Sequence, residues 1–187
     1  HTNKKMTGGI AIGQVLRLND DPGFTSSSGL EKKQSDIFLA AELSLPYASY
    51  ISFQGLLGSN FKTKKTDFNA GFDYKTLYLD TNYSFLQADS EEHRLNPIEE
   101  WTISTGHKLN YNWDVKSNLR YDQTESHLAS LGAGLAYENQ CVLVNLEMDR
   151  RYSLEGTSPP TTNFSFAISL KGFSTSKMTA ISEKSCK

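Results

Sequence analysis

Long stretches of the chain alternate strictly between apolar and polar residues. From Val142 to Met148 every second residue is apolar, while Asn145, Glu147 and Asp149 take positions between and after them. The same period of two runs through 131–137 and, after Pro159, through 163–173. Large apolar groups on one side and charged groups on the other indicate a strand whose two faces meet different surroundings. The segment 131–173 therefore predicts three strands.

The same pattern recurs along the rest of the chain, and no segment has a sustained helical period. It predicts further strands over residues 9–18, 36–45, 47–57, 68–74, 77–85, 101–109 and 113–121. The total is about ten strands of roughly 9–12 residues, longer than the usual ~5–6 and close to the ~9–11 that cross a bilayer at a tilt. The chain is thus predicted to be all-β.

The connections between these strands alternate in length. Tight connections fall near Pro46, Lys75, Tyr111 and Asn139, and longer polar ones occupy 19–34, 58–66, 88–99, 122–127 and 153–162. An antiparallel up-and-down meander with short turns on one rim and long loops on the other is typical of an outer-membrane β-barrel. Aromatic residues close to the tight turns suit the interfacial girdle of such a barrel: Tyr47, Tyr74, Tyr111, Trp113 and Tyr137.

Composition narrows the classes of protein to which the chain can belong. A formal net charge of -2 gives no electrostatic case for nucleic acid as a partner. No run approaches the ~18 apolar residues of a membrane-spanning helix, whereas barrel strands need no such run. No charged-then-apolar leader is visible, and residues 1–7 look like a cut end, so we expect a fragment of a longer chain.

Candidate chemistry is sparse. The alternation places one set of charged residues together on the polar face, where they line either a polar barrel interior or a generally solvated surface: Asp80, Lys108, Lys116, Arg120, Glu147 and Asp149. Acids do not stand in pairs at a spacing that suggests catalysis, and histidines and cysteines lack metal-ligand spacing. We therefore predict no catalytic residue, metal or cofactor.

Four short segments near the C-terminus resemble the end of the lipopolysaccharide-assembly family LptD, also called OstA, in its alphaproteobacterial form. They are Leu135–Cys141, Asp149–Tyr152, Pro159–Thr161 and 164–173, ending in Leu-Lys-Gly-Phe. The upstream likeness, at 12–14, 28–30 and 34–36, is looser. The chain departs from the family pattern at Gln140, where Glu is usual, and in the tail after residue 173.

The resemblance implies an architecture and a function. Residues 1–173 would be the C-terminal portion of a large transmembrane barrel in the outer membrane of a Gram-negative bacterium, and 174–187 a periplasmic tail. The barrel would insert lipopolysaccharide into the outer leaflet, with an LptE-type plug lipoprotein in its lumen and an LptA-type periplasmic bridge protein delivering the substrate. The substrate would leave sideways into outer-membrane lipid, so the protein would be a transporter and no enzyme.

The resemblance also assigns roles to particular residues. Cys141 would form a disulfide with a cysteine of an absent periplasmic domain, which the oxidising periplasm permits. Two alternatives remain open. Cys141 could form a disulfide with Cys186, or it could be a small buried residue at the start of a strand without a disulfide. The last strand would form one side of the lateral gate through its apolar face: Phe164, Phe166, Ile168 and Leu170.

Two other readings of the pattern remain open. A stand-alone small barrel, either a porin-like channel or an outer-membrane enzyme, would pair its first strand with its last. A soluble β-rich carbohydrate-binding domain would bury a core and dissolve without detergent.

Overall fold

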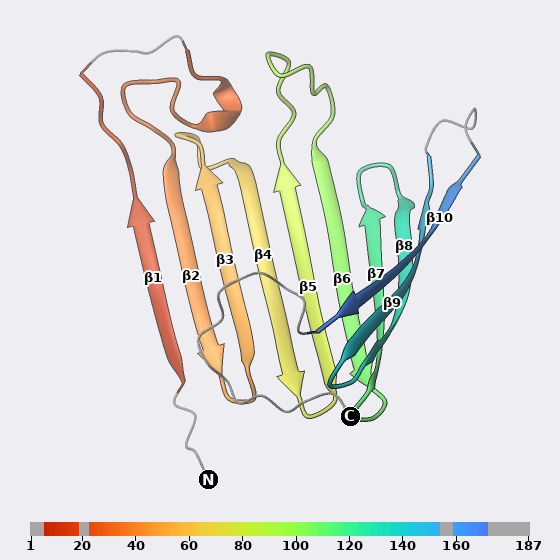
Figure 1. Cartoon of the computed structure of the whole chain (residues 1–187). Helices are drawn as coiled ribbons and strands as arrows, with labels where there is room; N and C mark the ends of the chain where they lie inside the picture. Colours follow the sequence, from red (N-terminus) through yellow and green to blue (C-terminus); the bar gives the residue numbers. More distant parts are fainter. Residues whose placement is uncertain (1–5, 19–22, 154–158, 172–187) are drawn as a thin grey trace.

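In the computed structural model, ten antiparallel strands form one continuous sheet in strict chain order (Figure 1). The structure describes residues 6–18, 23–153 and 159–171. The strands are β1 (Thr7–Gly13), β2 (Ile37–Leu45), β3 (Ser49–Leu57), β4 (Thr63–Tyr74), β5 (Leu77–Leu86), β6 (Ile98–Lys108), β7 (Trp113–Asp122), β8 (His127–Glu138), β9 (Val142–Arg151) and β10 (Thr161–Leu170). The predicted all-β meander of about ten strands is confirmed.

The sheet is a single layer without a hydrophobic core. No apolar side chain of the described residues is buried, and the buried polar residues among them are Ser35 and Asp89. A soluble domain covers one face of each sheet with a second layer. In this sheet no second layer of the described residues covers the apolar face. An uncovered apolar face is expected of a sheet that contacts lipid.

The two edges of the sheet stay apart. Among the described residues β1 pairs with β2 alone and β10 with β9 alone. A stand-alone ten-strand barrel would require β1 and β10 to pair, so the sheet is an open section suited to a larger barrel. Figure 1 shows β9 and β10 turning forward from the plane of the earlier strands, which gives the sheet its curvature.

The short connections gather at one rim, drawn at the bottom of Figure 1. Two of them are closed by an asparagine side chain. Asn139 Oδ1 accepts the backbone N–H groups of Cys141 (2.9 Å) and Val142 (2.7 Å), and Asn110 Oδ1 accepts those of Asn112 (2.9 Å) and Trp113 (3.0 Å). Such side chains replace the backbone carbonyl in a tight turn. We call this the short-turn rim and the opposite one the long-loop rim.

Several predicted boundaries are corrected. The β7–β8 connection, predicted as a polar loop over 122–127, is a tight turn in which Ser126 takes a φ of 53° and Asp122 Oδ1 accepts the N–H of Glu125. Connection length therefore does not alternate as strictly as predicted. β1 ends at Gly13 instead of residue 18, and β10 begins at Thr161 and ends at Leu170. β4, β6 and β8 begin earlier than predicted, and β4 includes residues 63–66 of the predicted loop 58–66. The predicted tail 174–187 lies outside the described residues.

Aromatic pairs mark both ends of the apolar face. Tyr47 and Tyr74 meet edge to face with ring centroids 5.1 Å apart, and Trp113 lies 4.9 Å from Tyr137, both beside the short-turn rim. A third pair, Tyr83 with Trp101 at 4.9 Å, lies toward the long-loop rim. Aromatic side chains at these depths suit the two water–lipid interfaces.

In the described residues no helix is long and apolar enough to cross a membrane.

Candidate functional site

The charged residues singled out from the sequence lie on one face of the sheet. Strand pairing shows that this face is continuous from β5 to β7. Asp80 pairs with Ser104, Ser104 pairs with Asn118, and Gly106 pairs with Lys116. Lys108, Arg120, Glu147 and Asp149 follow in the same phase, opposite Asp114, Thr102, Gly134 and Gly132. We call this surface the polar face. Directly paired residues of neighbouring strands point to the same side, so these charged residues share one face of the sheet. That this face lines a barrel lumen stays a prediction.

Glycines on the polar face let neighbouring side chains lie flat across the sheet. A Cβ at Gly106 would stand 2.0–2.2 Å from ring atoms of Tyr78, and one at Gly71 would stand 2.6 Å from the ring of Tyr50. Tyr50 crosses Gly71 and donates its hydroxyl to Asp80 Oδ1 at 2.7 Å. A tyrosine lying over a glycine of the next strand covers backbone that would otherwise be bare. On the polar face, the rings of Tyr50 and Tyr78 therefore cover the backbone at Gly71 and Gly106.

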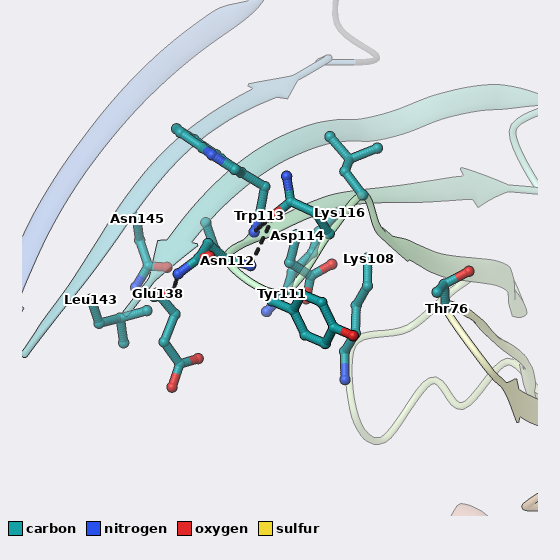
Figure 2. A pocket seen from close by; sticks show the side chains of 13 residues that line it. Thr76, Lys108, Tyr111, Asn112, Trp113, Asp114, Lys116, Glu138, Leu143 and Asn145 are labelled. Atoms are coloured by element: carbon teal, nitrogen blue, oxygen red, sulfur yellow. Dashed lines mark hydrogen bonds between the residues drawn. The ribbon is translucent and has the colours of Figure 1, made fainter. Parts of the chain in front are cut away.

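A hollow of about 730 Å³ opens on the polar face at the short-turn rim (Figure 2). Lys108, Tyr111 and Asp114 line one part of it, and Glu138 and Asn145 line another. We call it the rim hollow. Figure 2 shows Asn112 between the two parts, where its side-chain amide donates to the Glu138 carbonyl at 2.7 Å.

A second hollow, of about 270 Å³, lies further up the same face. Its polar-face residues are Tyr78, Ser104, Lys116, Asn118, Gly134, Glu147 and Asp149. We call it the wall hollow. Lys116 lines both hollows, so they adjoin.

On the long-loop rim, two loops far apart in the sequence are joined around a buried carboxylate. Asp89, which is 6% exposed, accepts the backbone N–H of Ser27 (2.8 Å) and that of Glu91 (2.9 Å). Ser27 lies in the short 3-10 helix η1 (Ser26–Ser28) between β1 and β2. We call this set of contacts the loop clasp. It holds the β1–β2 loop against the β5–β6 loop.

Glu92 and Lys64 extend the loop clasp. Glu92 accepts hydrogen bonds from the hydroxyls of Thr25 (2.7 Å) and Ser27 and pairs with Arg94 at 2.8 Å. Lys64, at the start of β4, donates to the Ser26 backbone carbonyl at 2.8 Å and forms an ion pair with Asp36 at 2.7 Å. The loop clasp therefore ties the tops of β2, β4 and β5 together. The sequence pattern identified these loops only as long polar connections and did not predict the clasp.

Two carboxyl groups of the loop clasp, those of Asp89 and Glu92, are held ionised. Hydrogen bonds from Ser27 and Thr25, with Arg94 beside them, lower the pKa of Glu92 to about 2. Burial by itself would raise the pKa of Asp89, but the N–H groups of Ser27 and Glu91 outweigh it and lower that pKa below its ordinary value. Because both pKa values are lowered, the clasp gains stability above the ordinary carboxyl pKa and loses it as pH falls toward the lowered values.

We expect Asp89→Ala to release the loop clasp, because it leaves the Ser27 and Glu91 N–H groups without acceptors in a buried site. Hydrogen exchange at residues 25–28 of the full-length protein should speed up by about tenfold or more. Glu31→Ala, an exposed acid in the same loop, should leave exchange unchanged. In the wild type, protection should persist at pH 5 and disappear as pH falls toward 2. Loss of protection already at pH 5–6 would contradict the assignment.

Cys141 lies in the β8–β9 turn on the short-turn rim. It is half-buried, and its carbonyl accepts the N–H of Lys171 at 2.7 Å. Cys141 is the one cysteine of the described residues, so no disulfide joins two of them. The bond to a further periplasmic domain stays a prediction.

The apolar residues singled out on the last strand form an exposed edge. Phe164 and Phe166 are 78% and 62% exposed, and Ile168 and Leu170 are 57% and 56% exposed. All four share the face opposite Asn163 and Ser165. Their role in a lateral gate also stays a prediction.

Comparison with known proteins adds a family assignment. The family model for LptD, LPS transport system D, matches residues 2–113, which is more than half of the chain. The match spans β1 to β6 and ends before the C-terminal segments whose resemblance to this family was the more distinctive. No curated protein matches the chain. On the family match, the chain belongs to the LptD family of lipopolysaccharide transport proteins.

Proposed function

We propose that this chain is a section of the outer-membrane barrel through which lipopolysaccharide reaches the outer leaflet. The observation that carries the proposal is the two-sided sheet: an apolar face without a covering layer, and a polar face continuous across its strands. In a closed barrel the first would meet lipid and the second would line a water-filled lumen. A lumen with charged and amide groups suits the sugar and phosphate portions of the substrate.

Partners follow from the same proposal. The open edges at β1 and β10 leave backbone N–H and C=O groups unpaired, and in lipid such groups require a further strand. Additional strands of the full-length protein would supply it. An LptE-type lipoprotein would sit against the polar face, and an LptA-type bridge protein would deliver lipopolysaccharide from the periplasmic side, where the short-turn rim lies.

Depletion of the full-length protein in its own bacterium tests the function. We expect newly made lipopolysaccharide to stop reaching the cell surface within a generation or so, measured by pulse labelling and by access of an impermeant antibody. As a control, an unrelated outer-membrane porin followed in the same cells should continue to assemble. Undiminished surface delivery after depletion would contradict the proposed function.

The role of Cys141 can be tested in the same native protein. If Cys141 bonds a cysteine of another domain, Cys141→Ser removes the mobility difference between non-reducing and reducing gels, whereas Cys186→Ser keeps it. A bond between Cys141 and Cys186 would instead be lost in both variants. If Cys141→Ser shows the same mobility difference as the wild type, Cys141 forms neither of these two bonds.

A further inference from the structure

Near the long-loop rim, the polar face carries a row of mostly apolar side chains. Its members follow one another through direct pairing across β2 to β6: Phe38, Leu56, Lys65, Leu86 and Ile98. Leu56 is an even number of residues from Tyr50 along β3, so its side chain points to the polar face. Apolar side chains that face water are unfavourable unless another part of the protein covers them.

The β1–β2 loop supplies such a cover at Leu56. Gly29 of this loop lies so close that a Cβ on Gly29 would stand 2.7 Å from Leu56 Cδ2. Gly29 is buried, and its φ of 68° is the left-handed conformation that glycine adopts most readily. Leu56 is half-buried, whereas Phe38 and Ile98 at the ends of the row are 42% and 41% exposed. The loop therefore folds onto the polar-face side of the sheet.

Hydrogen bonds to β4 and to the entrance of β2 hold the loop in this position. The Gly29 carbonyl accepts the N–H of Asp36 at 2.8 Å, and the Ser26 carbonyl accepts from Lys64 at 2.8 Å. The loop clasp then joins the same segment to the β5–β6 loop. Residues 25–30, which we call the lid segment, thus cross the tops of β2 to β5. Figure 1 shows η1 above the ends of β3 and β4.

The acids of the β5–β6 loop favour one position of the lid segment. Asp89 is 6% exposed and accepts the backbone N–H of Ser27 from the lid segment and that of Glu91 from its own loop. Glu92 accepts hydrogen bonds from the hydroxyls of Thr25 and Ser27. Movement of the lid segment away from the sheet breaks these bonds together and leaves both acids with fewer donors.

We propose that the lid segment closes the β2–β5 side of the outer mouth of the barrel, and that the loop clasp is the latch that keeps it closed. The proposal rests on the proposed function for a barrel whose mouth lies at the long-loop rim. A lumen wide enough for lipopolysaccharide would otherwise admit large solutes from outside. Asp89 and Glu92 hold the lid segment, and Leu56 is the surface on which it rests.

The test is labelling of introduced cysteines in the full-length protein, expressed in intact cells beside the native copy. The probe is a membrane-impermeant maleimide too large for porins, and labelling is counted above that of the protein without the introduced cysteine. Leu56→Cys reports on the surface under the lid segment and should react slowly. Asp89→Ala combined with Glu92→Ala should accelerate that reaction by about tenfold or more, because the lid segment then opens more often.

Matched variants separate the latch from a change of charge or of glycine content. Glu31→Ala combined with Glu125→Ala removes two exposed acids of the long-loop rim and should leave the Leu56→Cys rate within about twofold. Gly29→Val puts a branched side chain at a positive φ against Leu56 and should accelerate labelling. Gly13→Val should not, because no atom lies within 4 Å of a Cβ built there.

A second readout tests the barrier itself. Cells that carry Asp89→Ala combined with Glu92→Ala should become sensitive to a large glycopeptide antibiotic, whereas cells that carry the Glu31 and Glu125 control should not. Unchanged sensitivity would overturn the role as a barrier. Ser130→Cys, on the polar face of β8, should react at the same rate with and without the clasp. Equal acceleration at Ser130→Cys would show general loosening of the barrel and would overturn the latch.

A third cysteine distinguishes failure of the lid from failure of the proposed function. Lys32→Cys is in an exposed part of the β1–β2 loop. If it reacts in intact cells and Leu56→Cys reacts equally fast with the clasp intact, the lid segment covers nothing and the proposal is overturned alone. If Lys32→Cys does not react, the long-loop rim does not face the outside, which contradicts both the proposed function and the lid that depends on it.

Discussion

A single lysine on the apolar face, Ile103→Lys, should prevent most of the full-length protein from reaching its folded, heat-modifiable form. Ile103 is at the centre of β6, between Thr81 of β5 and Leu119 of β7, and its side chain is 38% exposed on the bare face. A lysine at the bilayer midplane of a barrel costs about 2–4 kcal/mol. That loss is a large fraction of the stability of a typical folded protein.

The adjacent residue provides the control. Ser104 is on the polar face, where Asp80 is directly opposite it. In the proposed barrel, Ser104→Lys would therefore add a charge beside an acid on the water-filled side. We expect the free energy of unfolding measured in urea to change by no more than about 0.5 kcal/mol, as for ordinary surface substitutions. Equal effects of the two lysines, or a larger effect at Ser104, would show that the two faces do not meet different solvents.

The sheet of residues 1–187, expressed without the rest of its protein, should fail to give a soluble monomer. Its described residues bury no apolar side chain, and strands at both edges leave a row of backbone groups unpaired. Exposed hydrophobic faces and open edges promote association with other chains. We therefore expect aggregates in buffer, measured by sedimentation and size-exclusion chromatography.

Detergent separates the two causes of that instability. A zwitterionic detergent covers the apolar face and leaves the edges open, so we expect it to disperse the fragment without producing one protease-resistant monomer. The full-length protein in the same detergent should resist protease. A soluble, monomeric fragment with cooperative unfolding in buffer would contradict the barrel assignment and favour a carbohydrate-binding domain.

Strand phase was accessible from the sequence because it depends on a period of two. In β4 through β9 each apolar residue next to a charged one can occupy only the opposite face, so the shared face of Asp80, Lys116 and Glu147 followed directly. The turn at Asn139 was equally local, because its side chain bonds residues two and three positions on.

Features that depend on contacts between residues distant in the sequence could not be predicted from the sequence. The alternation continues through Leu16 and Leu18, yet β1 ends at Gly13, because the Ser35 hydroxyl accepts the Val15 N–H at 2.8 Å and redirects the chain. Likewise Asp89 bonds Ser27 across 62 positions of sequence. Local patterns carry no information about such contacts.

The central claim is that the polar face lines the path of lipopolysaccharide. The most direct measurement places a photo-crosslinking amino acid at Asn118 or at Val115 of the same strand in the full-length protein in living cells. The account predicts crosslinks to lipopolysaccharide from Asn118, which is on the polar face, and few from Val115, which is on the apolar face near the short-turn rim, where the proposed barrel would meet the inner leaflet. Crosslinks at Val115 with none at Asn118 would contradict it.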